Sequence, residues 1–192
     1  GIVNGVAAAN IFVHDTYYVV AHFHFTLFPA VILGMAAGIT YWFPKMFGRM
    51  LNERLGKIHF WGTIISFNFI FIPLFVLGTA GQHRRIYNFQ NFPDLAGLQD
   101  LRVLATSALL VMLAFQAVFL FNFVVSMFKG KPAGKNPWKS NTLEWTAESP
   151  PPHGNWPEGL PNCYRGPYEY SVPGREEDYW PQDVPPDTAP AE

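Results

Sequence analysis

Residues 16–44 read TYYVVAHFHFTLFPAVILGMAAGITYWFP and contain no Asp, Glu, Lys or Arg. Two later runs, Ile58–His83 and Val103–Phe128, share this property. Each is longer than the roughly 20 residues that an α-helix needs to cross a hydrocarbon core of about 30 Å. The sequence therefore predicts an all-α, polytopic membrane protein with three complete transmembrane helices.

Other apolar sequence and several prolines refine this prediction. Residues 1–13 are apolar but too short to span, so we expect the truncated end of a helix from a longer protein, or from a subunit expressed in separate pieces. Pro29 and Pro73 lie inside predicted spans, where membrane helices tolerate kinks. Pro44 is expected to end the first span.

Composition excludes several classes of function. A net charge of −1 without a basic stripe argues against a nucleic-acid partner. The single cysteine, Cys163, excludes a disulfide framework within the chain. Lysines and arginines gather at residues 45–57 and 129–139, so the positive-inside rule places these edges on the cytoplasmic or matrix side.

The segment 129–192 differs from the rest of the chain. It holds most of the 17 prolines and many carboxylates but few aliphatic side chains. Such a composition cannot bury enough apolar surface to fold alone. We expect a cytoplasmic, extended, Pro-rich acidic tail that lies against neighbouring subunits, and we assign no role to His153.

His22 and His24 are the strongest candidate ligands, because ionisable side chains at membrane depth are costly and usually functional. A helix turns 100° per residue, so these two imidazoles point about 200° apart. They cannot ligate one metal from the same face, but they can ligate two metals on opposite sides of the helix. The alternative is a pair that only forms hydrogen bonds between helices.

The run HDTYYVVAHFH at residues 14–24 closely resembles the signature of subunit I of the heme–copper oxidases. The resemblance continues through GQHRR at 81–85, NPWK at 136–139, TLEW at 142–145 and SPPP at 149–152. It thus covers about residues 1–152, which correspond to the last four helices of a twelve-helix subunit. Phe25 and His83 depart from the family pattern, in which tyrosine and proline are usual.

This resemblance implies a role for each matching residue. His22 is expected to be the proximal ligand of the high-spin, oxygen-binding heme, and His24 an axial ligand of the low-spin heme. His14 and Asp15 resemble ligands of a magnesium or manganese ion, although Asp15 also suits a helix cap. Arg84 and Arg85 match the pair that holds heme propionates; ordinary interfacial arginines are the alternative.

The family activity is the reduction of dioxygen to water with electrons from cytochrome c, coupled to proton translocation in a bacterial plasma membrane or mitochondrial inner membrane. The implied cofactors are two hemes, of the heme a type, and a copper ion ligated by other parts of the subunit. The implied partners are the rest of subunit I, subunits II and III, cytochrome c and membrane lipid. A quinol oxidase, a nitric oxide reductase and a non-catalytic membrane scaffold stay open as alternatives.

Two further polar residues of the spans receive structural interpretations. His59 is expected at the membrane interface, at the start of its helix. Asn68 is expected to form a hydrogen bond between helices. Lys45 and the neighbouring loop lysines are interpreted as orientation signals.

Overall fold

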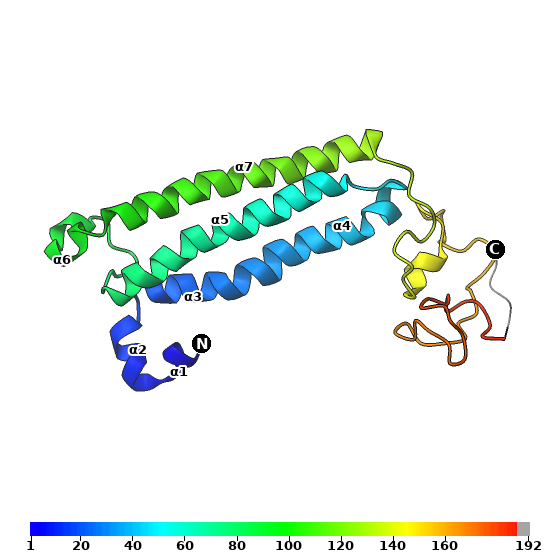
Figure 1. Ribbon diagram of the computed structural model, residues 1–192, viewed down its shortest axis with the longest axis horizontal. Helices are drawn as coiled ribbons and strands as arrows, with labels where there is room; N and C mark the ends of the chain where they lie inside the picture. Colours follow the sequence, from blue (N-terminus) through cyan, green and yellow to red (C-terminus); the bar gives the residue numbers. More distant parts are fainter. Residues whose placement is uncertain (188–192) are drawn as a thin grey trace. The chain divides into compact units, whose positions relative to one another are not determined.

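A computed structural model describes residues 1–187 (Figure 1). Its elements follow in the order α1 (Ile2–Gly5), α2 (Ala7–Val13), α3 (Tyr17–Leu27), η1 (Phe28–Leu33), α4 (Gly34–Phe47), α5 (Glu53–Thr79), η2 (Phe89–Asn91), α6 (Pro93–Ala96), α7 (Gln99–Lys129) and η3 (Leu143–Thr146). No β-strand occurs between residues 1 and 187, which confirms the predicted all-α class.

Three helical segments of the described chain are long and apolar enough to cross a membrane. They are Tyr17–Phe47, Glu53–Thr79 and Gln99–Lys129, so the predicted number of complete spans is confirmed. The apolar sequence at the beginning of the chain forms the short helices α1 and α2.

The second and third spans begin earlier than their charge-free runs, whereas α3 begins at Tyr17, one residue after its run starts. α5 starts at Glu53, where the sequence predicted Ile58, because the charged first turns extend the helix into water. There Lys57 forms an ion pair with Glu53 at 2.7 Å. At its other end α5 stops at Thr79, not His83, in a Schellman arrangement: Gln82 N donates to the Leu77 carbonyl, and Gly81 takes φ +89°.

Proline has two effects in the first span. At Pro29 the helix changes to a π-helical turn, Phe28–Leu33, because this residue has no N–H for the carbonyl four positions earlier. The prediction that Pro44 ends the helix is wrong. α4 continues to Phe47, and Gly48 N donates to the Pro44 carbonyl at 2.8 Å.

The chain divides into two compact units, of which the first comprises residues 1–38 and 53–122. In this unit α5 lies between α3 and α7 (Figure 1). Ala21 of α3 is fully buried against Phe67 and Phe71 of α5, and Ala108 of α7 completes the apolar core. Gly78 permits the closest approach, because a Cβ there would lie 1.9 Å from the backbone nitrogen of Tyr18.

The second unit joins residues 39–52 to the chain from Phe123 onward. Its centre is irregular, with Trp145 and Trp180 buried although the segment was predicted to be extended. The buried Lys45 ammonium donates to the carbonyls of Lys135, Ala147 and Glu148 at 2.7–3.3 Å. This side chain therefore organises the tail within its own unit, beyond serving as an orientation signal. Residues 188–192 of the predicted tail lie outside the described residues.

Candidate functional site

Helix α3 carries both candidate ligands and has a well-defined start. Thr16 is the N-cap, and its hydroxyl accepts a hydrogen bond from Tyr18 N at 3.2 Å. The same hydroxyl donates to the Val13 carbonyl at 2.6 Å, which fixes the chain entering the helix. His22 and His24 follow on the second and third turns, and both are half-buried.

The His24 ring is held on two sides. Its Nδ1 forms a hydrogen bond with the Val20 carbonyl at 2.8 Å, one turn earlier. Its face stacks on Phe71 of α5, with ring centroids 4.5 Å apart and planes inclined by 19°. Since a carbonyl only accepts, Nδ1 carries the proton and Nε2 keeps its lone pair. A second hydrogen bond of this kind is what orients a metal-ligating imidazole.

His22 lies beside a different segment. A Cβ placed on Gly1 would be 3.7 Å from its Nε2, so this ring lies next to the start of α1. His24, in contrast, contacts α5. The two imidazoles therefore have different neighbours, as two ligands diverging from one helix require.

A second cluster forms where the start of α3 meets the end of α5. Thr16 and His83 pair in an isolated antiparallel bridge, and Tyr17 N donates to the Gln82 carbonyl at 2.9 Å. Asp15 adopts φ +56° beside this bridge. Although they are 69 positions apart, Arg84 and Asp15 are joined by a backbone bond of 2.8 Å and by their side chains.

The side-chain contacts divide the Asp15 carboxylate between two partners. Arg84 approaches Oδ1 with Nε at 2.7 Å and Nη2 at 2.5 Å, whereas His14 Nε2 lies 3.7 Å from Oδ2. The hydrogen bond from Arg84 is the largest effect on the pKa of Asp15 and lowers it. Desolvation opposes this shift, and the charges of Arg84, His14 and Arg85 each add a smaller lowering. The carboxylate therefore stays ionised, with Oδ2 facing the imidazole.

The structure brings His14, Asp15 and Arg84 together but leaves Arg85 apart. The Arg85 side chain is exposed, and it makes no hydrogen bond with a described residue. Its backbone has φ +71°, which turns the chain away after the bridge. Within residues 1–187, no group of three or more His, Cys, Asp or Glu side chains is arranged to hold a metal ion.

Sequence reasoning missed the contacts of two polar residues, His59 and Arg102. His59 is buried: its Nε2 contacts Gln116 Oε1 at 3.2 Å, and Gln116 Nε2 donates to Thr63 at 2.8 Å. Asn68, expected to bridge helices, donates within α5 to the Ile64 carbonyl. The signal for His59 was its spacing of four residues from Thr63 on one helix face.

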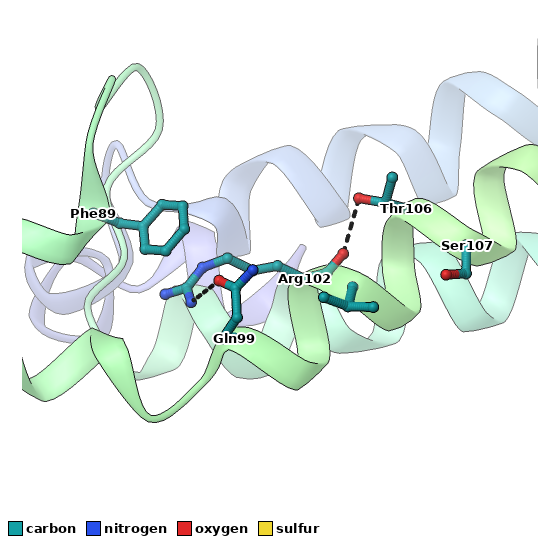
Figure 2. Close-up of a pocket in the computed structure, with 6 residues that line it drawn as sticks. Phe89, Gln99, Arg102, Thr106 and Ser107 are labelled. Atoms are coloured by element: carbon teal, nitrogen blue, oxygen red, sulfur yellow. Dashed lines mark hydrogen bonds between the residues drawn. The ribbon is translucent and has the colours of Figure 1, made fainter.

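The second missed residue is Arg102 at the start of α7 (Figure 2). Its guanidinium donates to Gln82 Oε1 at 3.0 Å, to Gln99 Oε1 at 3.2 Å and to the Leu95 carbonyl at 2.7 Å. Gln82 thereby links α7 to the bridge beside Asp15 and Arg84. The available signal was an arginine directly before a charge-free span.

Comparison with known families shows which proteins this chain is similar to. The family model described as "Cytochrome C and Quinol oxidase polypeptide I" matches residues 1–109, which include all six candidate residues. The chain belongs to this family. It is an integral membrane protein, and its heme–copper oxidase relatives are oxidoreductases.

Individual relatives of the polypeptide I family extend the match to the tail. The chain is 43% identical over 190 residues to the alternative cytochrome c oxidase subunit 1 of Bradyrhizobium diazoefficiens, covering 98% of this chain and 32% of that protein. It is 47% identical to the cytochrome c oxidase subunit 1 of Thermostichus vulcanus over 92% of this chain and 31% of that protein. The chain thus spans about a third of the length of these relatives.

A relative named for a different electron donor also matches. The cytochrome bo(3) ubiquinol oxidase subunit 1 of Buchnera aphidicola is 35% identical over 81% of this chain and 24% of its own length. The family therefore includes oxidases named for cytochrome c and oxidases named for ubiquinol. This leaves the donor of this protein to be decided by experiment.

Proposed function

We propose that this chain supplies axial histidines to two hemes in a respiratory oxidase that reduces dioxygen to water with electrons from cytochrome c, coupled to proton translocation. The observation that carries the proposal is the placement of His22 and His24 on one membrane helix against different neighbours. When bound, the two hemes supply electron transfer and an oxygen-binding iron, and a copper ion would be held by other parts of the complete subunit.

The donor chemistry of the two histidines fits this role. Neutral imidazole is a usual axial ligand of heme iron. The hydrogen bond between His24 Nδ1 and Val20 leaves Nε2 as the ligating atom, and the stacked Phe71 limits rotation of the ring. We assign His24 to the low-spin heme and His22 to the high-spin heme.

The neighbouring cluster sets the charge beside the hemes. The free Oδ2 of Asp15 and the Nε2 of His14 would hold part of the shell of a magnesium or manganese ion, which prefers oxygen ligands. Arg84 is bound to Asp15, while Arg85 remains available for a heme propionate. The backbone bridge between Thr16 and His83 keeps Arg84 next to Asp15.

Partners and topology follow from the same proposal. A heme–copper oxidase subunit I+III of Aeropyrum pernix matches 84% of this chain at 40% identity, which supports contact with subunit III, and we propose subunit II as a further partner. The lysine-rich ends support a tail on the cytoplasmic or matrix side. Protease added to the opposite side of sealed vesicles should leave the tail intact, and cleavage there would reverse the topology.

An optical spectrum of the purified complex tests the proposal. The wild-type complex should show heme bands in a reduced-minus-oxidised spectrum, and His24→Ala should lose the low-spin component. His153→Ala in the tail is a matched control that should leave the bands unchanged. Bands that are absent in the wild type, or identical in His24→Ala, would reject the ligand assignment.

A quinol-oxidising enzyme is the second candidate, favoured by the match to a ubiquinol oxidase subunit. The two candidates share the histidine ligands and differ in the reductant. Steady-state oxygen consumption by the complex with reduced cytochrome c, compared with a soluble quinol, distinguishes them. Turnover with quinol alone would replace the first candidate by the second.

A further inference from the structure

A pocket of about 340 Å³ lies at the start of α7 (Figure 2). It is lined by Phe89, Gln99, Arg102, Val103, Thr106 and Ser107. The wall is therefore polar on α7, with one guanidinium and two hydroxyls, and aromatic on the side of Phe89. The pocket lies where the charged loop before α7 meets the charge-free run that begins at Val103.

The Arg102 guanidinium in this wall has no anionic partner. Its hydrogen bonds go to neutral oxygens of Gln82, Gln99 and Leu95, and its carbon lies 3.7 Å from the centroid of the Phe89 ring. No carboxylate of residues 1–187 forms a salt bridge with it. Since a guanidinium has five N–H donors, these three hydrogen bonds leave two. A half-buried cation of this kind is stabilised by an anion that accepts both.

An exposed apolar stripe continues from the pocket along the same face of α7. Val103 and Ser107 in the pocket are followed at helical spacing by side chains that are all more than half exposed. They are Leu110, Leu113, Leu120 and Phe121. A ligand that fills the pocket and this stripe therefore has an anionic head and a long apolar tail.

We infer that the pocket binds the phosphate of a membrane phospholipid, with an acyl chain along the α7 stripe. The guanidinium binds phosphate oxygens in a fork, and Ser107 supplies a hydroxyl that has no partner in the described chain. The inference depends on α7 spanning the membrane, not on the proposed oxygen reduction. It can therefore fail while the heme assignment stands, and the heme spectrum reports on the latter separately.

Lipid retention by the intact oxidase complex provides the test. The complex is washed in detergent, and bound phospholipid is counted by native mass spectrometry in the wild type, Arg102→Gln and Arg54→Gln. Arg54 is an exposed arginine near the start of α5 and serves as the control. Arg102→Gln should bind one lipid about tenfold more weakly or worse, because a charged hydrogen bond is lost. If Arg102→Gln retained as much phospholipid as Arg54→Gln, the inference would be overturned.

Val103→Trp is a second variant that leaves the guanidinium and its hydrogen bonds in place. The indole fills the pocket from its exposed wall, so the same lipid should be lost while the heme spectrum stays normal. Phosphatidylglycerol in detergent should then raise the melting temperature of the delipidated wild type but not that of Arg102→Gln or Val103→Trp. An equal rise with inorganic phosphate alone would assign a free-anion site instead, and an unchanged lipid count in Val103→Trp would place the lipid elsewhere.

Discussion

Arg84 and Asp15 form a two-point ion pair across the junction of α3 and α5. Both Nε and Nη2 of the arginine approach the same carboxylate oxygen, at 2.7 and 2.5 Å. The backbone N–H of Arg84 also donates to the carbonyl of Asp15, so the pairing is set by main chain as well as side chains. This arrangement holds the second carboxylate oxygen of Asp15 toward the imidazole of His14.

The stability of this junction should depend on pH in a defined direction. Because Arg84 lowers the pKa of Asp15 in the folded chain, the ion pair stabilises the fold above the ordinary carboxyl pKa of about 3.9. Its contribution is lost as pH falls through the lowered value. The melting temperature of Asp15→Asn should therefore lie below that of the wild type at neutral pH, and the difference should shrink below about pH 4.

Asp94→Asn, in the exposed first turn of α6, is the control for this comparison. It should match the wild type throughout the pH series. A gap between wild type and Asp15→Asn that widens on acidification would contradict the assigned ion pair.

Gly78→Ala should separate α3 from α5. A Cβ at Gly78 would lie 1.9 Å from Tyr18 N, and backbone atoms cannot move aside as a flexible side chain can. We expect a loss of about 1–3 kcal/mol in unfolding free energy, measured by thermal or denaturant unfolding of the detergent-solubilised complex.

Gly56→Ala is the matched control for Gly78→Ala, since nothing lies within 4 Å of its Cβ position on the same helix. There alanine should be neutral or should stabilise by up to about 1 kcal/mol, because glycine is a poor helix residue. Equal losses at the two positions would mean that close packing is not the reason for Gly78.

Phe71→Ala should disturb the His24 ring without removing the ligand. The stacked contact of 4.5 Å with Phe71 would be lost, and the imidazole would keep its hydrogen bond to Val20 and its ring contact with Phe23. We expect a shifted and broadened low-spin band in the optical spectrum. Phe69→Ala, an exposed phenylalanine on the same helix, should leave the band in place, and an unchanged Phe71→Ala spectrum would show that stacking does not position His24.

Lys45→Met should loosen the segment from Lys135 to Glu148. The three carbonyls that now accept from the ammonium would lose charged hydrogen bonds worth about 1.5–3 kcal/mol each in isolation. Amide hydrogen exchange in this segment should accelerate at least about tenfold. Lys57→Met, which removes the exposed ion pair with Glu53, is the control. If amide exchange in this segment stayed slow in Lys45→Met, the three hydrogen bonds of Lys45 would not be what orders it.

The spans could be predicted from sequence because they follow from local pattern. Runs without charge must cross the bilayer, and the spacing of His22 and His24 fixes their divergence on any α-helix. Helix ends were less predictable. Charged first turns such as that at Glu53 remain helical outside the apolar run, and a proline near a helix end, as at Pro44, interrupts only one hydrogen bond.

The missed contacts depend on packing that no local pattern encodes. Whether Arg102 points to Gln82, or His59 to Gln116, is decided by how α5 and α7 face each other. The same holds for Lys45, whose partners are about a hundred positions away in an irregular tail. The Asp15–Arg84 pair lies between these cases: the family resemblance named both residues as site candidates, but their contact depends on the bridge between Thr16 and His83.

Electron paramagnetic resonance of the oxidised complex tests the two-heme assignment most directly. The account predicts that His24→Ala loses the low-spin heme signal and retains the high-spin heme, whereas His22→Ala perturbs the high-spin heme and retains the low-spin signal. Each variant would then report on its own iron. If both substitutions altered the same heme, or neither altered one, the claim that this helix holds two irons on opposite sides would be contradicted.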